Sequence, residues 1–266
     1  MAQYPHFDNT LKYAVQPAFV LLVVLWLVYW ADHLFLADFY KYGVLPKSIE
    51  GLKGILFMPL IHAKDDIKHI LNNSVPFFLL TTLLFYSYKS IAWKVFIASW
   101  VFTGIGLWIF AANKGSYHVG MSGVIYALVG FLFTSGTLRN YLPLQALSLF
   151  IVFLYGSLIW GIFPTAPRVS WEGHLSGFVV GIVLAFVYKT DGPQRPKYQY
   201  EIEKEMGIEP PDLEGMYWEK VRQLEEREKA KQEALHAQNQ MESNLKIVYH
   251  FVPKSDDEKG KSADKR

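Results

Sequence analysis

Residues 120–138 have the sequence GMSGVIYALVGFLFTSGTL, which carries no charged side chain and opens with a serine between glycines. Acidic residues are missing from a much wider region, since no Asp or Glu occurs between Ile67 and Trp171. A soluble domain usually carries about 25% charged residues. This chain has 19% charged and 52% hydrophobic residues, a balance that predicts a membrane domain.

Five further uncharged runs accompany this one, and a helix needs about 20 apolar residues to cross a bilayer. The six runs are 13–31, 70–88, 95–113, 121–138, 141–163 and 174–188. We therefore expect an all-α integral membrane protein. Its membrane domain, residues 13–190, would be a bundle of six transmembrane helices with a long first loop, preceded by a short N-terminal segment, residues 1–12.

Residues 191–266 form a hydrophilic tail. A linker follows Asp191, a charged helix with alternating signs is expected over 213–240, and residues 255–266 have the composition of a disordered end. The helix is either a solvated helix or a partner-binding or regulatory module. The net charge of +2, with both signs mixed in the tail, argues against nucleic acid as a partner. The absence of cysteine excludes disulfides and a cysteine nucleophile.

An even number of crossings puts both termini on one side of the membrane. The basic residues that follow the sixth run, Lys189, Arg195 and Lys197, favour a cytoplasmic location for the termini, whereas the five lysines of the first loop favour the opposite. We expect a multi-pass protein of the bacterial inner membrane with both termini in the cytoplasm.

Polar side chains at membrane depth are costly and often functional. Asn73 lies sixteen residues before Lys89, Ser122 seventeen before Arg139, and His174 fifteen before Lys189. At a rise of about 1.5 Å per residue, these separations are roughly 24, 25 and 22 Å. The second, fourth and sixth runs point the same way, so the three side chains are expected at one depth, below the membrane surface. His69 lies four residues before Asn73 and therefore on the same helix face.

Glycines surround two of these positions. Gly120 and Gly123 flank Ser122, and Gly173, Gly177 and Gly181 surround His174. Small residues four apart, as in Gly177-x-x-x-Gly181, allow close helix packing in membranes. We therefore expect the fourth and sixth helices to touch.

Nucleophilic acyl transfer is the chemistry that fits this set. A serine hydroxyl becomes a good nucleophile when an imidazole accepts its proton, and backbone N–H groups at a helix start can stabilise an oxyanion. His69 and Asn73 could add side-chain donors.

Glu172 is the only acid near His174, and two residues along a helix point in nearly opposite directions. The sequence therefore predicts a Ser122/His174 dyad rather than a triad. Dispersed histidines without cysteine make a poor zinc site, so neither a metal nor another cofactor is expected.

These residues resemble the motifs of rhomboid intramembrane serine proteases. The matching segments are His69-x-x-x-Asn73, Gly120-x-Ser122-Gly123 followed by Tyr126, and His174-x-x-Gly177-x-x-x-Gly181. The resemblance implies Ser122 as nucleophile, His174 as general base, and His69, Asn73 and the Ser122 amide as oxyanion hole, with Tyr126 packed on the His174 ring. The family's first loop often carries a Trp-Arg pair, and residues 32–68 contain no Trp, so the anchoring of this loop is expected to differ.

Two functions from different classes follow from the resemblance. The first is an intramembrane serine endopeptidase that cleaves membrane proteins within or near their transmembrane segments. The alternative is a catalytically silent relative that binds membrane proteins for trafficking or quality control, although such relatives typically lose the Ser or the His. A transporter is a weaker third, because no charges pair across the membrane midplane.

Overall fold

A computed structural model describes residues 10–112, 115–164, 169–208, 211–244 and 248–251. These residues are mainly helical, and among them the only β pairing is an isolated bridge between Val44 and His118. The predicted disordered end, residues 255–266, and most of the predicted N-terminal segment lie outside the described residues. The all-α prediction is confirmed for the part of the chain described.

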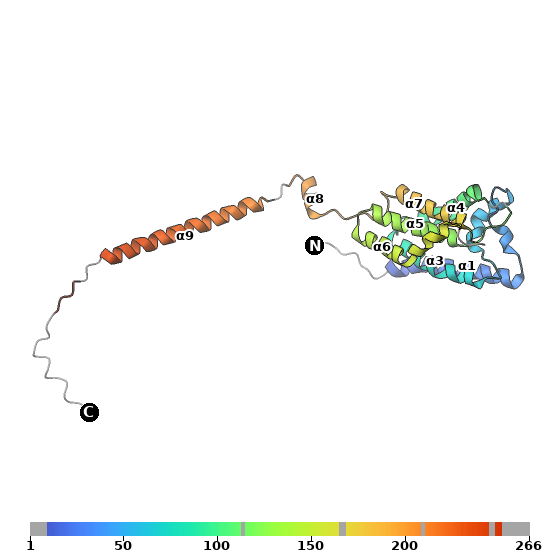
Figure 1. Ribbon diagram of the computed structural model, residues 1–266, viewed down its shortest axis with the longest axis horizontal. Coiled ribbons are helices and arrows are strands. Elements are labelled where there is room, and N and C mark those ends of the chain that lie inside the picture. Colours follow the sequence, from blue (N-terminus) through green and yellow to red (C-terminus); the bar gives the residue numbers. More distant parts are fainter. Residues whose placement is uncertain (1–9, 113–114, 165–168, 209–210, 245–247, 252–266) are drawn as a thin grey trace, which may run out of the picture. The chain divides into compact units, whose positions relative to one another are not determined.

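The chain divides into two compact units, Met1–Pro196 and Lys197–Arg266. Six longer helices of the first unit lie side by side (Figure 1): α1 (Thr10–Phe35), α3 (Ile67–Ser87), α4 (Ala92–Phe110), α5 (Ser122–Leu138), α6 (Leu142–Tyr155) and α7 (Trp171–Val187). Its short helical turns are η1 (Phe39–Tyr42), η2 (Glu50–Lys53), α2 (Gly54–Phe57), η3 (Met58–Leu60) and η4 (Gly156–Ile162). The second unit contains α8 (Gln199–Glu205) and α9 (Leu213–Asn244).

Five of the six predicted runs each overlap one helix of the first unit, although residue 113, at the end of the third run, lies outside the described residues. The run 141–163 is divided between α6 and η4. Within the described residues, four helical stretches are long and apolar enough to cross a membrane: Leu11–Phe35, Ile67–Ser87, Ala92–Phe110 and Leu142–Ile162. The apolar helices α5 and α7 have 17 residues each, or roughly 25 Å at the helical rise, somewhat short of a hydrocarbon core of about 30 Å. An integral membrane protein is therefore established, whereas exactly six crossings stay a prediction.

The predicted contact between the fourth and sixth helices is present, because α5 packs along α7 at van der Waals distance between backbones. A Cβ atom placed on Gly177 would collide with the carbonyl oxygen of Gly123, and one placed on Gly181 would collide with that of Ala127. The two helices are also held together where they end. Arg139 is buried and donates to the carbonyl oxygens of Tyr188, at 2.5 Å, and Asp191, at 2.6 Å. Arg139 thus joins the end of α5 to the residues that follow α7.

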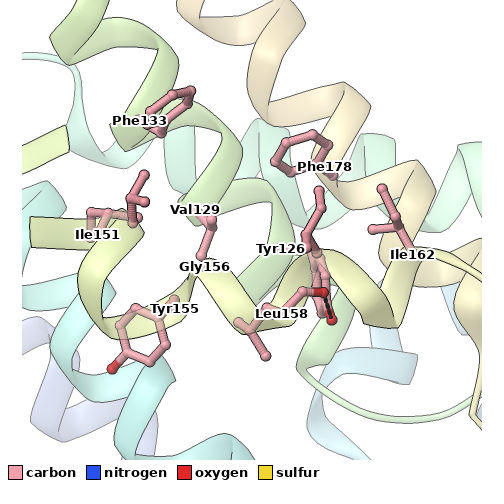
Figure 2. Close-up of a pocket in the computed structure, with 11 residues that line it drawn as sticks. Tyr126, Val129, Phe133, Ile151, Tyr155, Gly156, Leu158, Ile162 and Phe178 are labelled. Atoms are coloured by element: carbon pink, nitrogen blue, oxygen red, sulfur yellow. Dashed lines mark hydrogen bonds between the residues drawn. The ribbon is translucent and has the colours of Figure 1, made fainter. Parts of the chain in front are cut away.

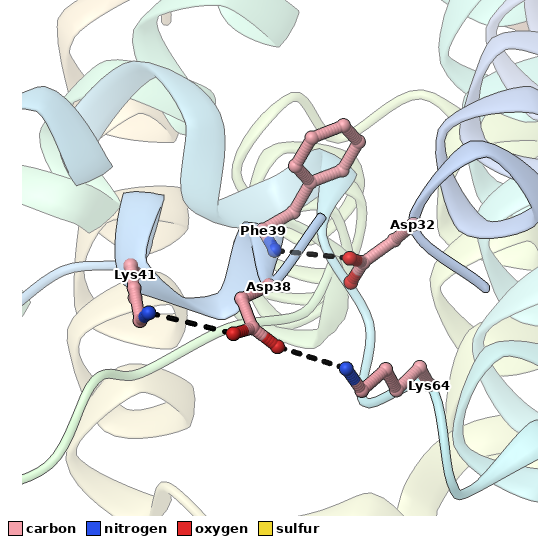
Figure 3. Close-up of polar contacts among 5 residues, drawn as sticks. All are labelled: Asp32, Asp38, Phe39, Lys41 and Lys64. Carbon is pink, nitrogen blue, oxygen red and sulfur yellow. Dashed lines mark hydrogen bonds and ion pairs between the residues drawn. The ribbon is translucent and has the colours of Figure 1, made fainter. Parts of the chain in front are cut away.

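The first loop is anchored at its ends by carboxylates (Figure 3). The Asp32 carboxylate at the end of α1 accepts the backbone N–H of Phe39 at 3.0 Å. The Lys64 ammonium lies 2.8 Å from the Asp38 carboxylate, and Lys41 lies 3.4 Å from it. These hydrogen bonds lower the pKa of Asp38, that from Lys64 most. The two ends of the loop are therefore tied to each other.

The middle of the loop is attached to α4 and to the segment before α5. The indole N–H groups of Trp100 and Trp108, both on α4, donate to the carbonyl oxygens of Leu56 and Ser48 at 3.0 and 2.8 Å. Val44 and His118 exchange backbone hydrogen bonds of 2.9 and 2.8 Å. Tryptophan side chains therefore hold this loop, but they belong to α4 and not to residues 32–68.

The helices of the second unit are polar. The helix α9 begins at Leu213 as predicted and runs on to Asn244, and none of its residues is buried. A helix that is polar all round gains its support from solvent and from charge pairs along its own surface. Both interpretations of the tail helix, a solvated helix and a partner-binding or regulatory module, stay predictions, and no residue predicted for the site lies in this unit.

We expect Gly177→Ala to lower the free energy of unfolding by about 1–3 kcal/mol, because the added methyl group meets backbone that cannot rotate away. The measurement is the thermal unfolding midpoint in detergent. Gly156→Ala is the matched control, since a Cβ there would meet only Val152, at 3.7 Å. Equal midpoints for the two variants would contradict the close packing of α5 on α7.

Candidate active site

Ser122 and His174 come together at the start of α5 and α7. Ser122 is the first residue of α5, and His174 lies in the first turn of α7. The His174 Nε2 atom is 2.8 Å from the Ser122 hydroxyl oxygen. The start of α5 is closely packed, because a Cβ atom placed on Gly123 would lie 2.7 Å from Thr103 Cγ2 and 3.2 Å from the carbonyl oxygen of Gly173.

The second nitrogen of the His174 imidazole determines its tautomer. Its Nδ1 atom lies 2.9 Å from the carbonyl oxygen of Gly161 in η4. A carbonyl oxygen only accepts, so Nδ1 carries the proton and donates it. The Nε2 atom is then the free acceptor that faces the Ser122 hydroxyl, which is the form required of a general base.

Tyr126 lies flat against this imidazole. The ring centroids of Tyr126 and His174 are 4.2 Å apart with an interplanar angle of 9°. The Tyr126 hydroxyl donates to the carbonyl oxygen of Leu158 in η4 at 2.7 Å, as Figure 2 shows. Thus η4 holds both His174 and the ring that packs on it, and Tyr126 lies where the sequence predicted.

Glu172 does not take part in this contact. Helix α7 begins at Trp171, so Glu172 and His174 are two positions apart within one helical turn and point in different directions. The observed partners of the imidazole nitrogens are a hydroxyl and a backbone carbonyl. The geometry agrees with a dyad whose base is oriented by the main chain.

His69 and Asn73 lie in the first two turns of α3, next to the segment just before Ser122. They meet at Gly120, whose backbone φ of +119° suits glycine. A Cβ atom at this position would lie 2.9 Å from His69 Nε2 and 3.9 Å from Asn73 Nδ2. Gly120 therefore leaves room for the His69 ring two residues before Ser122, whereas a Cβ there would be in ordinary contact with Asn73.

His62 was missed by the sequence analysis. It lies in the loop between η3 and α3, is 1% exposed, and its Nε2 atom is 3.0 Å from Asn73 Nδ2. Its ring centroid is 4.9 Å from that of His69. Burial, with a smaller contribution from His69, lowers the pKa of His62 to about 3. Its position in a loop without helical periodicity gave no signal that it would approach Asn73.

A second missed residue is His118, which joins the first loop to the start of α7. Its backbone pairs with Val44, and its Nδ1 atom lies 2.7 Å from the hydroxyl oxygen of Ser170. Ser170 precedes α7, and its carbonyl oxygen accepts the backbone N–H of His174 at 3.2 Å. His118 therefore supports the helical turn that carries His174.

An apolar pocket of about 270 Å³ opens beside Tyr126 (Figure 2). Its walls come from α5, α6, η4 and α7, and include Val129, Phe133, Ile151, Tyr155, Leu158 and Phe178. Tyr126 therefore contacts both the His174 ring and an apolar volume. Among the described residues, no three His, Asp or Glu side chains are grouped so as to hold a metal ion.

The site lies within a stretch of the chain that matches a known protein family. The model of the Rhomboid domain matches residues 50–190, more than half of the 266-residue chain. The chain belongs to the rhomboid family. Its rhomboid domain contains all of the site residues described above and excludes α1 and the tail.

The relatives found are mycobacterial. An uncharacterized protein of Mycobacterium tuberculosis is 33% identical over 162 residues, which make up 58% of this chain and 65% of that protein. An uncharacterized protein of Mycobacterium bovis gives the same values. One of Mycobacterium leprae is 28% identical over 201 residues, or 72% of this chain and 76% of that protein. The rhomboid chain thus spans 65% of the length of the first two relatives.

We expect Glu172→Gln in this rhomboid protein to keep most of the reactivity of Ser122, because the main-chain carbonyl of Gly161 orients the base. The rate of labelling by a serine-directed fluorophosphonate measures it. His174→Ala serves as the inactive control. A loss of about 10⁴-fold, the scale of removing a triad carboxylate in soluble serine proteases, would mean that Glu172 supports the imidazole after all.

Proposed function

We propose that this chain is an intramembrane serine endopeptidase that cleaves other membrane proteins within or near their transmembrane segments. The observation that carries the proposal is the 2.8 Å contact between Ser122 Oγ and His174 Nε2, with His174 Nδ1 committed to the Gly161 carbonyl. Membership of the rhomboid family supports the reaction type. The alternative, a silent binding relative, is less well supported, since this chain keeps both residues in hydrogen-bonding geometry.

Each site residue has one role in the proposed reaction. His174 Nε2 accepts the Ser122 proton as the serine oxygen attacks the peptide carbonyl, and the imidazolium then protonates the leaving amine. Water deprotonated by the same imidazole hydrolyses the acyl-enzyme. Backbone and side-chain N–H groups that face a developing oxyanion lower the barrier. We assign that role to His69, Asn73 and the Ser122 amide.

The supporting residues act through geometry. Tyr126 keeps the His174 ring in plane, Gly120 leaves room for His69, and Gly123 and Gly177 bring the two helices together. We propose transmembrane protein segments as substrates, since the apolar pocket beside Tyr126 suits apolar side chains. We also propose six crossings in the bacterial inner membrane, with both termini in the cytoplasm.

Ser122→Ala and His174→Ala are each expected to abolish cleavage of a transmembrane reporter, because the two side chains create one nucleophile. The measurement is cleavage of the reporter co-reconstituted in liposomes with purified protein. Unfolding midpoints near that of the parent provide the control for folding. Cleavage by either variant at a rate comparable with the parent would exclude the dyad.

His69→Ala and Asn73→Ala are expected to slow cleavage without abolishing fluorophosphonate labelling of Ser122. Loss of one oxyanion donor typically costs about 10²–10³ in rate, whereas the dyad itself remains. The measurement compares kcat for the reporter with the extent of labelling. If both variants cleave at the parental rate, the two side chains are structural and backbone alone holds the oxyanion.

A further inference from the structure

His62 is a buried imidazole to which the proposed reaction gives no role. It follows η3, and η3 is hydrogen-bonded to the segment just before Ser122: the Gly120 N–H donates to the carbonyl oxygen of Met58 at 3.0 Å. Its Nε2 atom faces two nitrogen atoms. One is Asn73 Nδ2 at 3.0 Å, and the other is the backbone nitrogen of Met121 at 3.4 Å.

These two contacts determine which atoms carry protons. The backbone N–H of Met121 can only donate, so His62 Nε2 must present its lone pair and the ring proton must lie on Nδ1. Because His62 Nε2 is an acceptor, the atom of the Asn73 amide that faces it must be the nitrogen, which donates, and not the oxygen. The His62 ring thereby fixes the orientation of an amide that could otherwise turn by 180°.

The consequence for Asn73 follows from the chemistry of the amide. A primary amide nitrogen carries two hydrogens, so the bond to His62 uses one and leaves the other for a second acceptor. In the turned orientation, the amide oxygen would take the place of the nitrogen. The amide oxygen, an acceptor with a partial negative charge, would then face the oxyanion once it formed.

The surroundings of His62 keep it in the neutral form that this role needs. A protonated imidazole donates from both nitrogens and would oppose the donors on Asn73 and Met121. The ring is 1% exposed and packs edge-on against His69. These surroundings disfavour a positive charge on His62, as its lowered pKa indicates.

We propose that His62 is a positioning residue that holds the Asn73 amide nitrogen toward the oxyanion of the reaction and couples it to the backbone just before Ser122. The inference rests on the proposed function, since it needs Asn73 to act as an oxyanion donor. His62 contacts neither Ser122 nor His174 in the hydrogen bonds described, so it acts through Asn73 and not on the nucleophile.

A double-mutant cycle between His62 and Asn73 tests this inference. His62→Leu removes the acceptor, and we expect it to lower kcat by about 10²-fold, the lower end of the effect of losing an oxyanion donor, with KM changed little. In the Asn73→Ala background, His62→Leu should cost almost nothing further, because the side chain that it orients is already gone. His62→Gln, whose amide oxygen can accept from the same donors, should restore most of kcat.

The outcomes separate this inference from the proposed function. Full kcat for His62→Leu, or losses that multiply in the double variant at matched unfolding midpoints, would overturn the positioning role while leaving the protease intact. A parent protein that neither cleaves the reporter nor labels with fluorophosphonate would overturn both proposals. Should His62→Leu fail to fold, His62→Met replaces it in the cycle, and a His62→Gln variant no faster than His62→Met would also overturn the positioning role.

Discussion

The backbone contact between α5 and α7 is the constraint on which the site depends. Helices can approach this closely only where Cβ atoms are absent, and Gly177 and Gly181 supply those positions on α7. The approach sets the axial register of the two helices as well as their distance. Ser122 and His174 both stand in first turns, so this register brings a hydroxyl and an imidazole to 2.8 Å. Arg139 fixes the same pair of helices at the opposite end through carbonyl oxygens of residues that follow α7.

The irregular segments around these two helices supply hydrogen-bond partners for His174 and Asn73. The carbonyl group of Gly161 in η4 orients the base, and the segment after η3 brings His62 to Asn73. A main-chain carbonyl group is uncharged, whereas a carboxylate at the same place would add a negative charge. Charged groups at membrane depth are costly. The first loop is held by carboxylates at its ends and by two α4 indoles along its middle. The site is therefore a product of helix packing and of loop anchoring together.

The sequence predicted the parts of this arrangement that follow from helical geometry. Glycine spacing predicted the contact between α5 and α7, which is observed. Helical rise predicted one depth for Ser122, His174 and Asn73, and this stays a prediction, with which the contact between Ser122 and His174 agrees. Contacts made by irregular backbone could not be predicted in the same way. The partners of His62 and Gly161 lie 11 and 13 residues away across irregular backbone, and that of His118 lies 52 residues away, so no helical periodicity links them. The burial of Arg139 could not be predicted for a related reason, since it depends on carbonyl groups exposed where a different helix ends.

The most direct measurement is a crystal structure of the protein after reaction with a fluorophosphonate, a tetrahedral mimic of the acyl-transfer intermediate. The account predicts a covalent bond from Ser122 Oγ to phosphorus. It also predicts that the phosphonyl oxygen lies within hydrogen-bonding distance of Asn73 Nδ2, with the Asn73 nitrogen still bound to His62. An unmodified Ser122, or a phosphonyl oxygen turned away from His69 and Asn73, would contradict it.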